Sequence, residues 1–240
     1  MPVAVRAVDA LKVYGEGQNE VIALNHVDLE IAQGRFTAIM GPSGCGKSTL
    51  LHCLAGLDSL TSGKVMVGET DLGGLDDDEL TRLRRDRIGF VFQAYNLLPM
   101  LTAAENIRLP MTIAGREPDP DWLEAIVEVL HLADRMHHRP AELSGGQQQR
   151  VAVARALVTR PDIVFADEPA GNLDSRAGTE LLAFLREAVD RFGQSLVLVT
   201  HDPNAAALSD RVLFMADGSV TGEINAPSIE AILDRARTGA

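Results

Sequence analysis

Cysteine and long apolar runs are both scarce in this sequence. Two cysteines among 240 residues, Cys45 and Cys53, are too few for a disulfide framework and suit a reducing compartment. No apolar run approaches the roughly 20 residues that a helix needs to cross a bilayer, and residues 1–6 show no signal-peptide pattern. A cytoplasmic location is therefore expected, and any work at a membrane would depend on another chain.

Basic residues are also in short supply. There are 22 Lys and Arg against 34 Asp and Glu, so the formal net charge is −12. Broad nucleic-acid binding needs a net basic face, so we expect no nucleic-acid partner. The hydrophobic fraction of 46% and the charged fraction of 23% are typical of a globular protein, and the length suits one domain with an added lobe.

Short apolar runs rich in β-branched residues alternate with helical stretches along the chain. Each run is bounded by turn residues or charges, as buried parallel strands are. The expected strands are residues 36–40, 88–92, 163–166 and 195–200. The expected helices between them are residues 48–56, 147–158 and 177–192. This alternation predicts an α/β fold with a mostly parallel sheet covered by helices.

Two regions depart from this alternation. Residues 3–31, together with 63–70, indicate short antiparallel strands, and residues from about 97 to 150 are mainly helical. We interpret them as an N-terminal antiparallel β subdomain and an inserted α-helical lobe within a single domain, residues 1–240. Acids at 76–79 precede arginines up to position 87, an order that complements the dipole of one helix.

A glycine-rich loop follows the first expected core strand and precedes a helix. It fits the pattern G-x-x-x-x-G-K-[ST], whose glycines let several backbone N–H groups converge on a phosphate, and the helix start adds its positive dipole end. Lys47 supplies a charge for the outer phosphates, and Ser48 offers a hydroxyl to Mg²⁺. The loop residues are Gly41, Pro42, Ser43, Gly44, Cys45, Gly46, Lys47 and Ser48.

Two adjacent carboxylates stand at the end of another expected core strand. Asp167 and Glu168 follow the apolar run 163–166, and ligands of such sheets collect at the carboxyl ends of the strands. Asp167 is suited to hold Mg²⁺ through water, and Glu168 to act as a general base on the attacking water. A solvated turn is the alternative, but the phosphate-binding loop in the same chain argues against it.

A second anion-binding pattern precedes the helix expected at 147–158. Leu143-Ser144-Gly145-Gly146-Gln147 combines a serine cap with two glycines at a helix start. One chain therefore carries two helix ends suited to phosphate. A simple N-cap with a glycine turn is the alternative for this segment taken by itself.

Together, in this order, these motifs resemble those of the ATPase subunits of ABC transporters, over nearly the whole chain. The resemblance implies a P-loop NTPase core with ATP and Mg²⁺ as its ligands. In that family Thr49 continues the phosphate loop, Gln93 reaches Mg²⁺ or the water, and His201 contacts the γ-phosphate. Asp174 falls in the D-loop, and Tyr14 stands where an aromatic ring stacks on adenine.

The resemblance also implies partners. Two subunits would meet head to tail, as a homodimer. Each ATP would be held between the phosphate loop of one subunit and the family's signature motif, residues 143–147, of the other. Ser144 and Gly146, with Gly145 and Gln147 beside them, would then reach the ATP bound to the partner chain. Closure of the pair would drive an integral-membrane permease, which places the protein peripherally on the inner face of the cell membrane.

Several segments are similar to one subgroup, the LolD, MacB and FtsE type, which serves lipoprotein release, macrolide export or envelope signalling. These segments include residues 92–99 and 170–175, with Ala170 where the subgroup usually has threonine. An export or envelope-directed role is the interpretation. An amino-acid or metal importer subunit, a soluble ABC ATPase outside transport, and a non-hydrolysing cassette are the alternatives.

Overall fold

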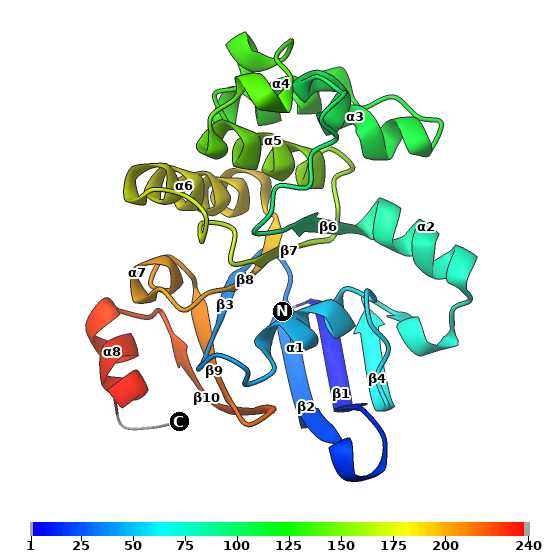
Figure 1. Ribbon diagram of the computed structural model, residues 1–240, viewed down its shortest axis with the longest axis vertical. Helices are drawn as coiled ribbons and strands as arrows, with labels where there is room; N and C mark the ends of the chain where they lie inside the picture. The colour runs from blue at the N-terminus through cyan, green and yellow to red at the C-terminus, as the bar shows by residue number, and fades with distance from the viewer. Residues whose placement is uncertain (1, 238–240) are drawn as a thin grey trace.

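A six-stranded sheet forms the centre of the computed structural model, which describes residues 2–237 (Figure 1). Its strands run parallel except β10, which is antiparallel to β9. Their order across the sheet is β10 (Ser219–Asn225), β9 (Arg211–Ala216), β3 (Phe36–Met40), β8 (Ser195–Val199), β7 (Ile163–Asp167) and β6 (Ile88–Val91). The mixed α/β class and the four core strands expected from the sequence are confirmed.

Strand β7 shows why these strands are apolar on both faces. Val164 and Ala166 pack into one hydrophobic cluster with helices α5 (Gly145–Leu157) and α6 (Ser175–Phe192). Ile163 and Phe165 pack into a second cluster with helix α1 (Lys47–Leu54) and the N-terminal sheet. Successive side chains of a strand point to opposite faces, so a strand covered on both sides must be apolar throughout. The central sheet is therefore the middle layer.

Strands β9 and β10 are absent from the sequence-based expectation. They form a hairpin whose pairing of Ala216 with Ser219 leaves Asp217-Gly218 as the turn, both with positive φ (45° and 75°). Asp-Gly between apolar segments is a strong signal for a two-residue hairpin. The signal was therefore present in the sequence.

The N-terminal sheet is antiparallel, as expected. Its strands lie in the order β2 (Val21–Ala32), β1 (Val3–Tyr14), β4 (Ser62–Val67) and β5 (Thr70–Asp71). Its apolar side chains share a cluster with α1 (Lys47–Leu54) and with the central sheet. Helix α1, which follows the phosphate-binding loop, is therefore held between two sheets.

The other helices cover the opposite face and the edges of the sheet. Figure 1 shows α3, α4 and α5 together above α6, and α8 near the C-terminal end of the chain. The α-helices are α2 (Asp77–Arg87), α3 (Ala103–Ile113), α4 (Pro120–Val129), α5 (Gly145–Leu157), α6 (Ser175–Phe192), α7 (Pro203–Ala206) and α8 (Ile229–Arg237). Short 3₁₀ helices span Gly17–Asn19, Leu72–Gly74, Ala133–Arg135 and Pro140–Glu142. Residues 97–150 are thus largely helical, while their independence as a lobe stays a prediction.

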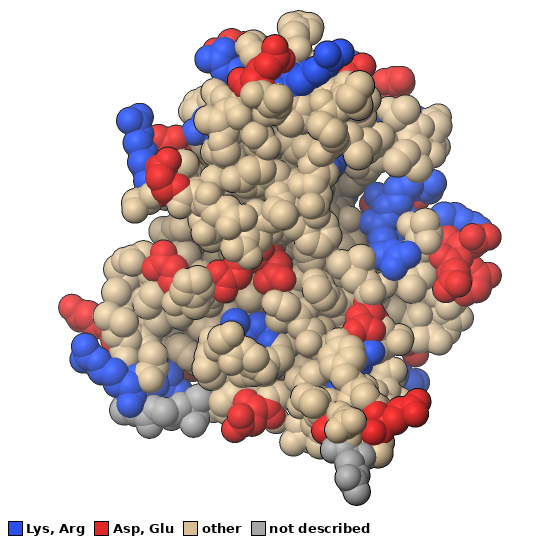
Figure 2. Space-filling model, viewed as in Figure 1, with Lys and Arg blue, Asp and Glu red and all other residues tan. Residues whose placement is uncertain are grey.

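Helix α2 carries the acid-to-base order noted in the sequence. Asp76 accepts a hydrogen bond from the Glu79 N–H at 2.8 Å, and the Glu79 carboxylate accepts one from the Asp76 N–H at 3.0 Å. This capping box fixes where the helix begins. Figure 2 shows neighbouring basic and acidic patches on the side of the molecule where α2 lies in Figure 1. Within residues 2–237, no helix is both long and apolar enough to cross a bilayer.

We expect Gly89→Ala to destabilise the protein because β6 lies close to α5. A Cβ at Gly89 would stand 2.6 Å from the Ala156 carbonyl oxygen and 3.0 Å from Val164 Cγ2. Backbone must move to relieve such contacts, at a cost of about 1–3 kcal/mol. Urea unfolding measures the resulting loss in the free energy of unfolding. Gly74→Ala, where a Cβ meets nothing within 4 Å, is the control, and equal stability of the two variants would contradict the prediction.

Candidate functional site

The phosphate-binding loop joins β3 to α1 in a conformation that requires glycine. Gly44 and Gly46 have φ values of 79° and 101°, in the left-handed region. A Cβ at Gly46 would lie 2.3 Å from the Ala23 carbonyl oxygen, and one at Gly41 would lie 2.2 Å from the Met215 carbonyl oxygen. Only glycine therefore lets the loop wrap closely enough to turn its N–H groups toward one anion.

Lys47 is held inside this loop. Its ammonium group donates to the carbonyl oxygens of Gly41 at 2.9 Å and Pro42 at 2.7 Å, and the residue is 8% exposed. Phosphate oxygens are stronger acceptors for an ammonium group than neutral carbonyls are. The charge is therefore already positioned where a bound phosphate would use it.

Ser48 and Asp167 lie together at the end of β7. The Ser48 hydroxyl donates to Asp167 Oδ1 at 3.2 Å. Burial raises the pKa of the Asp167 carboxyl and neighbouring Glu168 adds to this shift, while Ser48, His52 and Lys47 offset part of it. The Ser48 hydroxyl oxygen and the desolvated Asp167 carboxylate fit Mg²⁺, which prefers oxygen ligands. A cation bound there would also offset the cost of the buried charge.

His52 lies beside the same carboxylate, although it was not among the site residues expected from the sequence. It lies one turn after Ser48 on α1, and its Nε2 is 4.0 Å from Asp167 Oδ2. The spacing of four residues was the available signal, because residues i and i+4 share one face of a helix.

Glu168 and His201 form a second pair at the same edge. His201 Nδ1 lies 2.8 Å and 2.7 Å from the two carboxylate oxygens of Glu168. Glu168 has a positive φ of 46°, an uncommon conformation for a residue with a side chain. Its N–H donates to the Val199 carbonyl at 3.0 Å, so the strained residue is tied to β8. A cavity of about 440 Å³ opens beside Glu168, Thr200 and His201.

Gln93 lies just beyond β6 and contacts the segment after Glu168. Its Nε2 donates to Asn172 Oδ1 at 3.2 Å, and Asn172 Nδ2 donates to the Gln93 carbonyl oxygen at 3.2 Å. The backbone here is also held from α5, because Gln149 Nε2 donates to the Phe92 carbonyl oxygen at 3.1 Å. Gln149 is fully buried, and among residues 2–237 its Oε1 has no hydrogen-bond partner.

The segment Leu143–Gln147 begins α5. The Ser144 Oγ accepts from the Gln147 N–H at 3.3 Å, and Gln147 Oε1 accepts from the Ser144 N–H at 2.9 Å, which completes a capping box. A Cβ at Gly145 would lie 2.8 Å from the Tyr95 hydroxyl, and one at Gly146 would lie 3.1 Å from Ala177 Cβ. Asp174 caps α6 by accepting from the Ala177 N–H at 2.9 Å.

The structure brings some of the expected residues together and keeps others apart. The phosphate loop, the acid pair and His201 meet at the carboxyl edge of the sheet. The signature belongs to α5, which shares its apolar cluster with the opposite face of the sheet from α1. No hydrogen bond recorded for residues 2–237 joins 144–147 to 41–49. Within one chain, residues 144–147 therefore lie apart from the phosphate-binding loop.

Comparison with known proteins gives the family. Residues 24–171 match the ABC transporter family. The chain is 44% identical over 226 residues to the uncharacterised ABC transporter ATP-binding protein MJ0796 of Methanocaldococcus jannaschii, covering 91% of this chain and 96% of that protein. The chain belongs to the ABC transporter family of ATP-binding proteins.

Two other relatives and one solved structure extend this match. The lipoprotein-releasing system ATP-binding protein LolD of Anaeromyxobacter dehalogenans is 45% identical over 92% of this chain and 95% of its own length. The macrolide export ATP-binding/permease protein MacB of Marinobacter nauticus is 46% identical over 91% of this chain, which spans 34% of that protein. A dimeric, post-hydrolysis structure of MJ0796 with ADP and Pi has a TM-score of 0.83 at 41% identity, over 93% and 99% of the two chains.

In this ABC ATPase, Tyr14, the aromatic residue expected to stack on adenine, is held by Asp58 through its hydroxyl group. The Tyr14 hydroxyl donates to Asp58 Oδ2 at 2.5 Å, and Lys12 donates to Asp58 Oδ1 at 2.6 Å. Tyr14 as a whole residue is 43% exposed.

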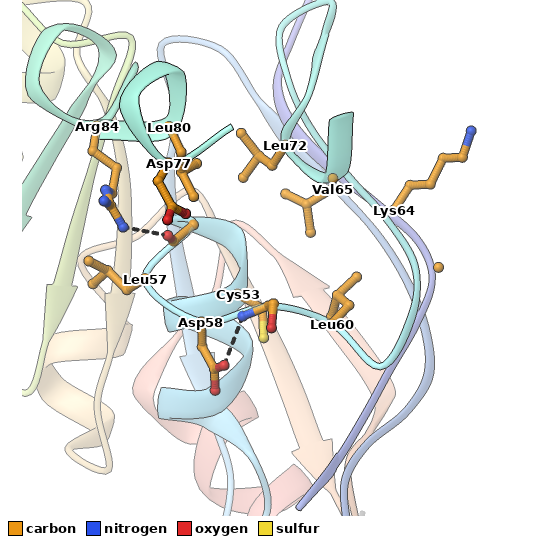
Figure 3. A pocket seen from close by; sticks show the side chains of 14 residues that line it. Cys53, Leu57, Asp58, Leu60, Lys64, Val65, Leu72, Asp77, Leu80 and Arg84 are labelled. Atoms are coloured by element: carbon orange, nitrogen blue, oxygen red, sulfur yellow. Dashed lines mark hydrogen bonds between the residues drawn. The ribbon is translucent and has the colours of Figure 1, made fainter. Parts of the chain in front are cut away.

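Asp58 is the anchor of this arrangement, and the sequence did not indicate its role. It lines a cavity of about 460 Å³ together with Cys53, Leu57 and Arg84 (Figure 3). Burial raises the pKa of the Asp58 carboxyl, but hydrogen bonds from Lys12 and Tyr14 outweigh it, so the net pKa is lowered. The same environment raises the pKa of the Cys53 thiol to about 11, chiefly through burial.

We expect Asp58→Asn to lower the free energy of unfolding by about 1 kcal/mol at pH 7. Because the folded pKa is lowered, the carboxylate stabilises the fold above its unfolded pKa of about 3.9 and stops doing so as pH falls through the folded value. The difference from wild type should therefore shrink below about pH 4 in urea unfolding. Asp134→Asn, at a largely exposed side chain, should change little at either pH, and an equal loss in both variants would contradict the prediction.

Asp167→Asn should have the opposite effect on the ligand-free protein. The raised pKa means that the ionised carboxylate costs stability at neutral pH, so the neutral amide should raise the thermal midpoint at pH 7. The gain should disappear below about pH 4, where the wild-type carboxyl is protonated. ATPase activity should nevertheless fall about a hundredfold or more. A lower midpoint at pH 7 would show that the buried charge is already compensated.

Proposed function

We propose that this chain binds Mg-ATP at the loop 41–49 and hydrolyses it within a head-to-tail dimer that drives a membrane permease. As an ABC transporter ATPase it has the chemistry of that family, and the assignment of each residue is our proposal. The observation that carries it is the position of Glu168 and His201 beside the Ser48–Asp167 pair, at the edge that the phosphate loop reaches. The proposed metal ligands, the proposed general base Glu168 and the proposed γ-phosphate contact His201 thus lie at the same edge of the sheet.

In this mechanism each side chain has a separate task. Lys47 and the loop N–H groups bind the outer phosphates, and Tyr14 stacks on the adenine. Ser48, Asp167 and Gln93 would hold Mg²⁺, which supplies charge neutralisation on the phosphate oxygens. Glu168 accepts a proton from the attacking water as its oxygen approaches the γ-phosphorus.

His201 would steady the charge that develops on the γ-phosphate. Its Nδ1 side is engaged by Glu168, which leaves Nε2 as the ring nitrogen that can face the phosphate. A ring nitrogen that carries a proton there can donate to a phosphate oxygen, and such a donor stabilises growing negative charge. The pairing with Glu168 also fixes the orientation of the ring.

Ser144 and Gly146 would complete the site in trans. In one chain they lie on the other layer from the phosphate loop, so a second copy must bring them to the nucleotide. The helix start and its two glycines offer N–H groups and a positive dipole end to the γ-phosphate. Binding of two ATP molecules would close the pair, and hydrolysis would reopen it.

The transport partner is proposed from the relatives. LolD is named for lipoprotein release and MacB for macrolide export, and MacB carries its permease in the same protein. We propose an export or envelope-directed permease and a cytoplasmic position on the inner face of the membrane. The segment Gln93–Arg116 is the proposed contact region, and Met100 and Ile113 within it are 77% and 70% exposed.

Glu168→Gln tests the proposal. The amide cannot accept the proton from water, so phosphate release should fall by about 10²–10⁴-fold while ATP binding is kept. The ATP-bound variant should form a stable dimer, measured by light scattering after gel filtration. Glu187→Gln, at an exposed side chain on α6, is the matched control. Unchanged turnover in Glu168→Gln would overturn the role of Glu168.

A tagged Glu168→Gln protein should also retain its partner when membranes are solubilised with Mg-ATP present. Recovery of a permease with few spans and a large external domain would support export. An importer permease with a binding protein would reverse the direction. Ribosomal or DNA-bound partners without any membrane protein would remove the transport role.

A further inference from the structure

Gln93 and Asn172 form a reciprocal pair of amides that the proposed mechanism leaves unexplained. The two hydrogen bonds run in opposite directions, one between the side chains and one from Asn172 to the Gln93 backbone, each at 3.2 Å. The residues are 79 positions apart, so the pair joins the end of β6 to the segment after β7. The pair therefore fixes Gln93 relative to the acid pair.

The pair determines which end of the Gln93 amide is free. A backbone carbonyl can only accept, so Asn172 must present Nδ2 to it and Oδ1 to its other neighbour. Oδ1 in turn can only accept, so Gln93 must present Nε2 to Asn172. The Oε1 atom of Gln93 is then the end that points away from Asn172. Mg²⁺ takes oxygen ligands, so this is the end that a metal site would need.

The segment that carries Asn172 is itself fixed. Gly171 N–H donates to the Glu168 carbonyl at 2.9 Å, and Leu173 N–H donates to the Ala170 carbonyl at 3.0 Å. A Cβ at Gly171 would stand 2.8 Å from Gln93 Nε2, so glycine leaves the space that the amide occupies. On the other side, Gln149 holds the Phe92 carbonyl. Both partners of the pair therefore sit on backbone that other contacts restrain.

We propose that Asn172 is a positioning residue that orients the Gln93 amide so that Oε1 faces the divalent cation bound with ATP. This rests on the proposed function, in which Gln93 is a metal ligand. Asn172 acts only through Gln93 and does not touch the metal. Without it, the Gln93 amide can rotate, and the nitrogen end competes with the oxygen end for the position beside the metal.

The test measures metal binding rather than turnover, on the Glu168→Gln background. The dissociation constant for ATP is measured by calorimetry with Mn²⁺ and again with EDTA. The constant in EDTA divided by the constant with Mn²⁺ gives the contribution of the metal to binding. Asn172→Ala should reduce this ratio roughly three- to tenfold, the range for a lost hydrogen bond to a metal ligand. The constant in EDTA should not change, which also shows that the variant is folded.

A double-mutant cycle separates positioning from a merely structural role. Gln93→Ala should reduce the ratio at least as much as Asn172→Ala, and adding Asn172→Ala to Gln93→Ala should reduce it no further. Asn225→Ala, the same change at an exposed position on β10, should leave the ratio at the Glu168→Gln value.

Each other result overturns the inference in a distinguishable way. A normal ratio in Asn172→Ala shows that Gln93 needs no orienting partner. A further loss in the double variant shows that Asn172 acts on the metal or the fold directly. A Glu168→Gln protein that fails to bind ATP in either condition refutes the proposed function, and this inference falls with it.

Discussion

The register of three neighbouring parallel strands is the constraint on which the site depends. Ile39 on β3 pairs with Val199 on β8, and Val199 pairs in turn with Asp167 on β7. Hydrogen bonds beyond the strands continue this row, from the Thr200 N–H to the Ile39 carbonyl and from the Glu168 N–H to the Val199 carbonyl. Parallel strands end at the same edge, so chain segments far apart in sequence deliver an anion-binding loop, two carboxylates and an imidazole to one place.

The same edge gathers charges that the fold alone would not favour. Burial and the neighbouring carboxylate raise the pKa of Asp167, and Glu168 adopts a left-handed backbone conformation. Each feature costs stability without its ligand. A cation bound beside Asp167 would offset the cost of that buried charge. Such strain is tolerated because apolar layers cover the sheet on both faces.

Much of this was predictable from the sequence, for identifiable reasons. The core strands and the phosphate loop follow from local signals: continuous apolar runs such as 163–166, and glycines at fixed spacing. Long-range pairs were not predictable, because no local pattern says that Asp58 lies under Tyr14 or that Asn172 meets Gln93. His52 and the hairpin at Asp217-Gly218 are different, since helical spacing and turn chemistry did mark them.

Two polar residues of α5 link this helix to the segment that carries Gln93. Gln149 holds the Phe92 carbonyl, and Arg155 donates to the carbonyl oxygens of Asn96 at 2.6 Å and Tyr95 at 2.9 Å. Burial lowers the pKa of Arg155, and a buried guanidinium is tolerated only when its donors are satisfied. Displacing residues 92–96 would leave these groups unpaired. The helix that begins at Gly145 and the segment that carries Gln93 are therefore expected to move together.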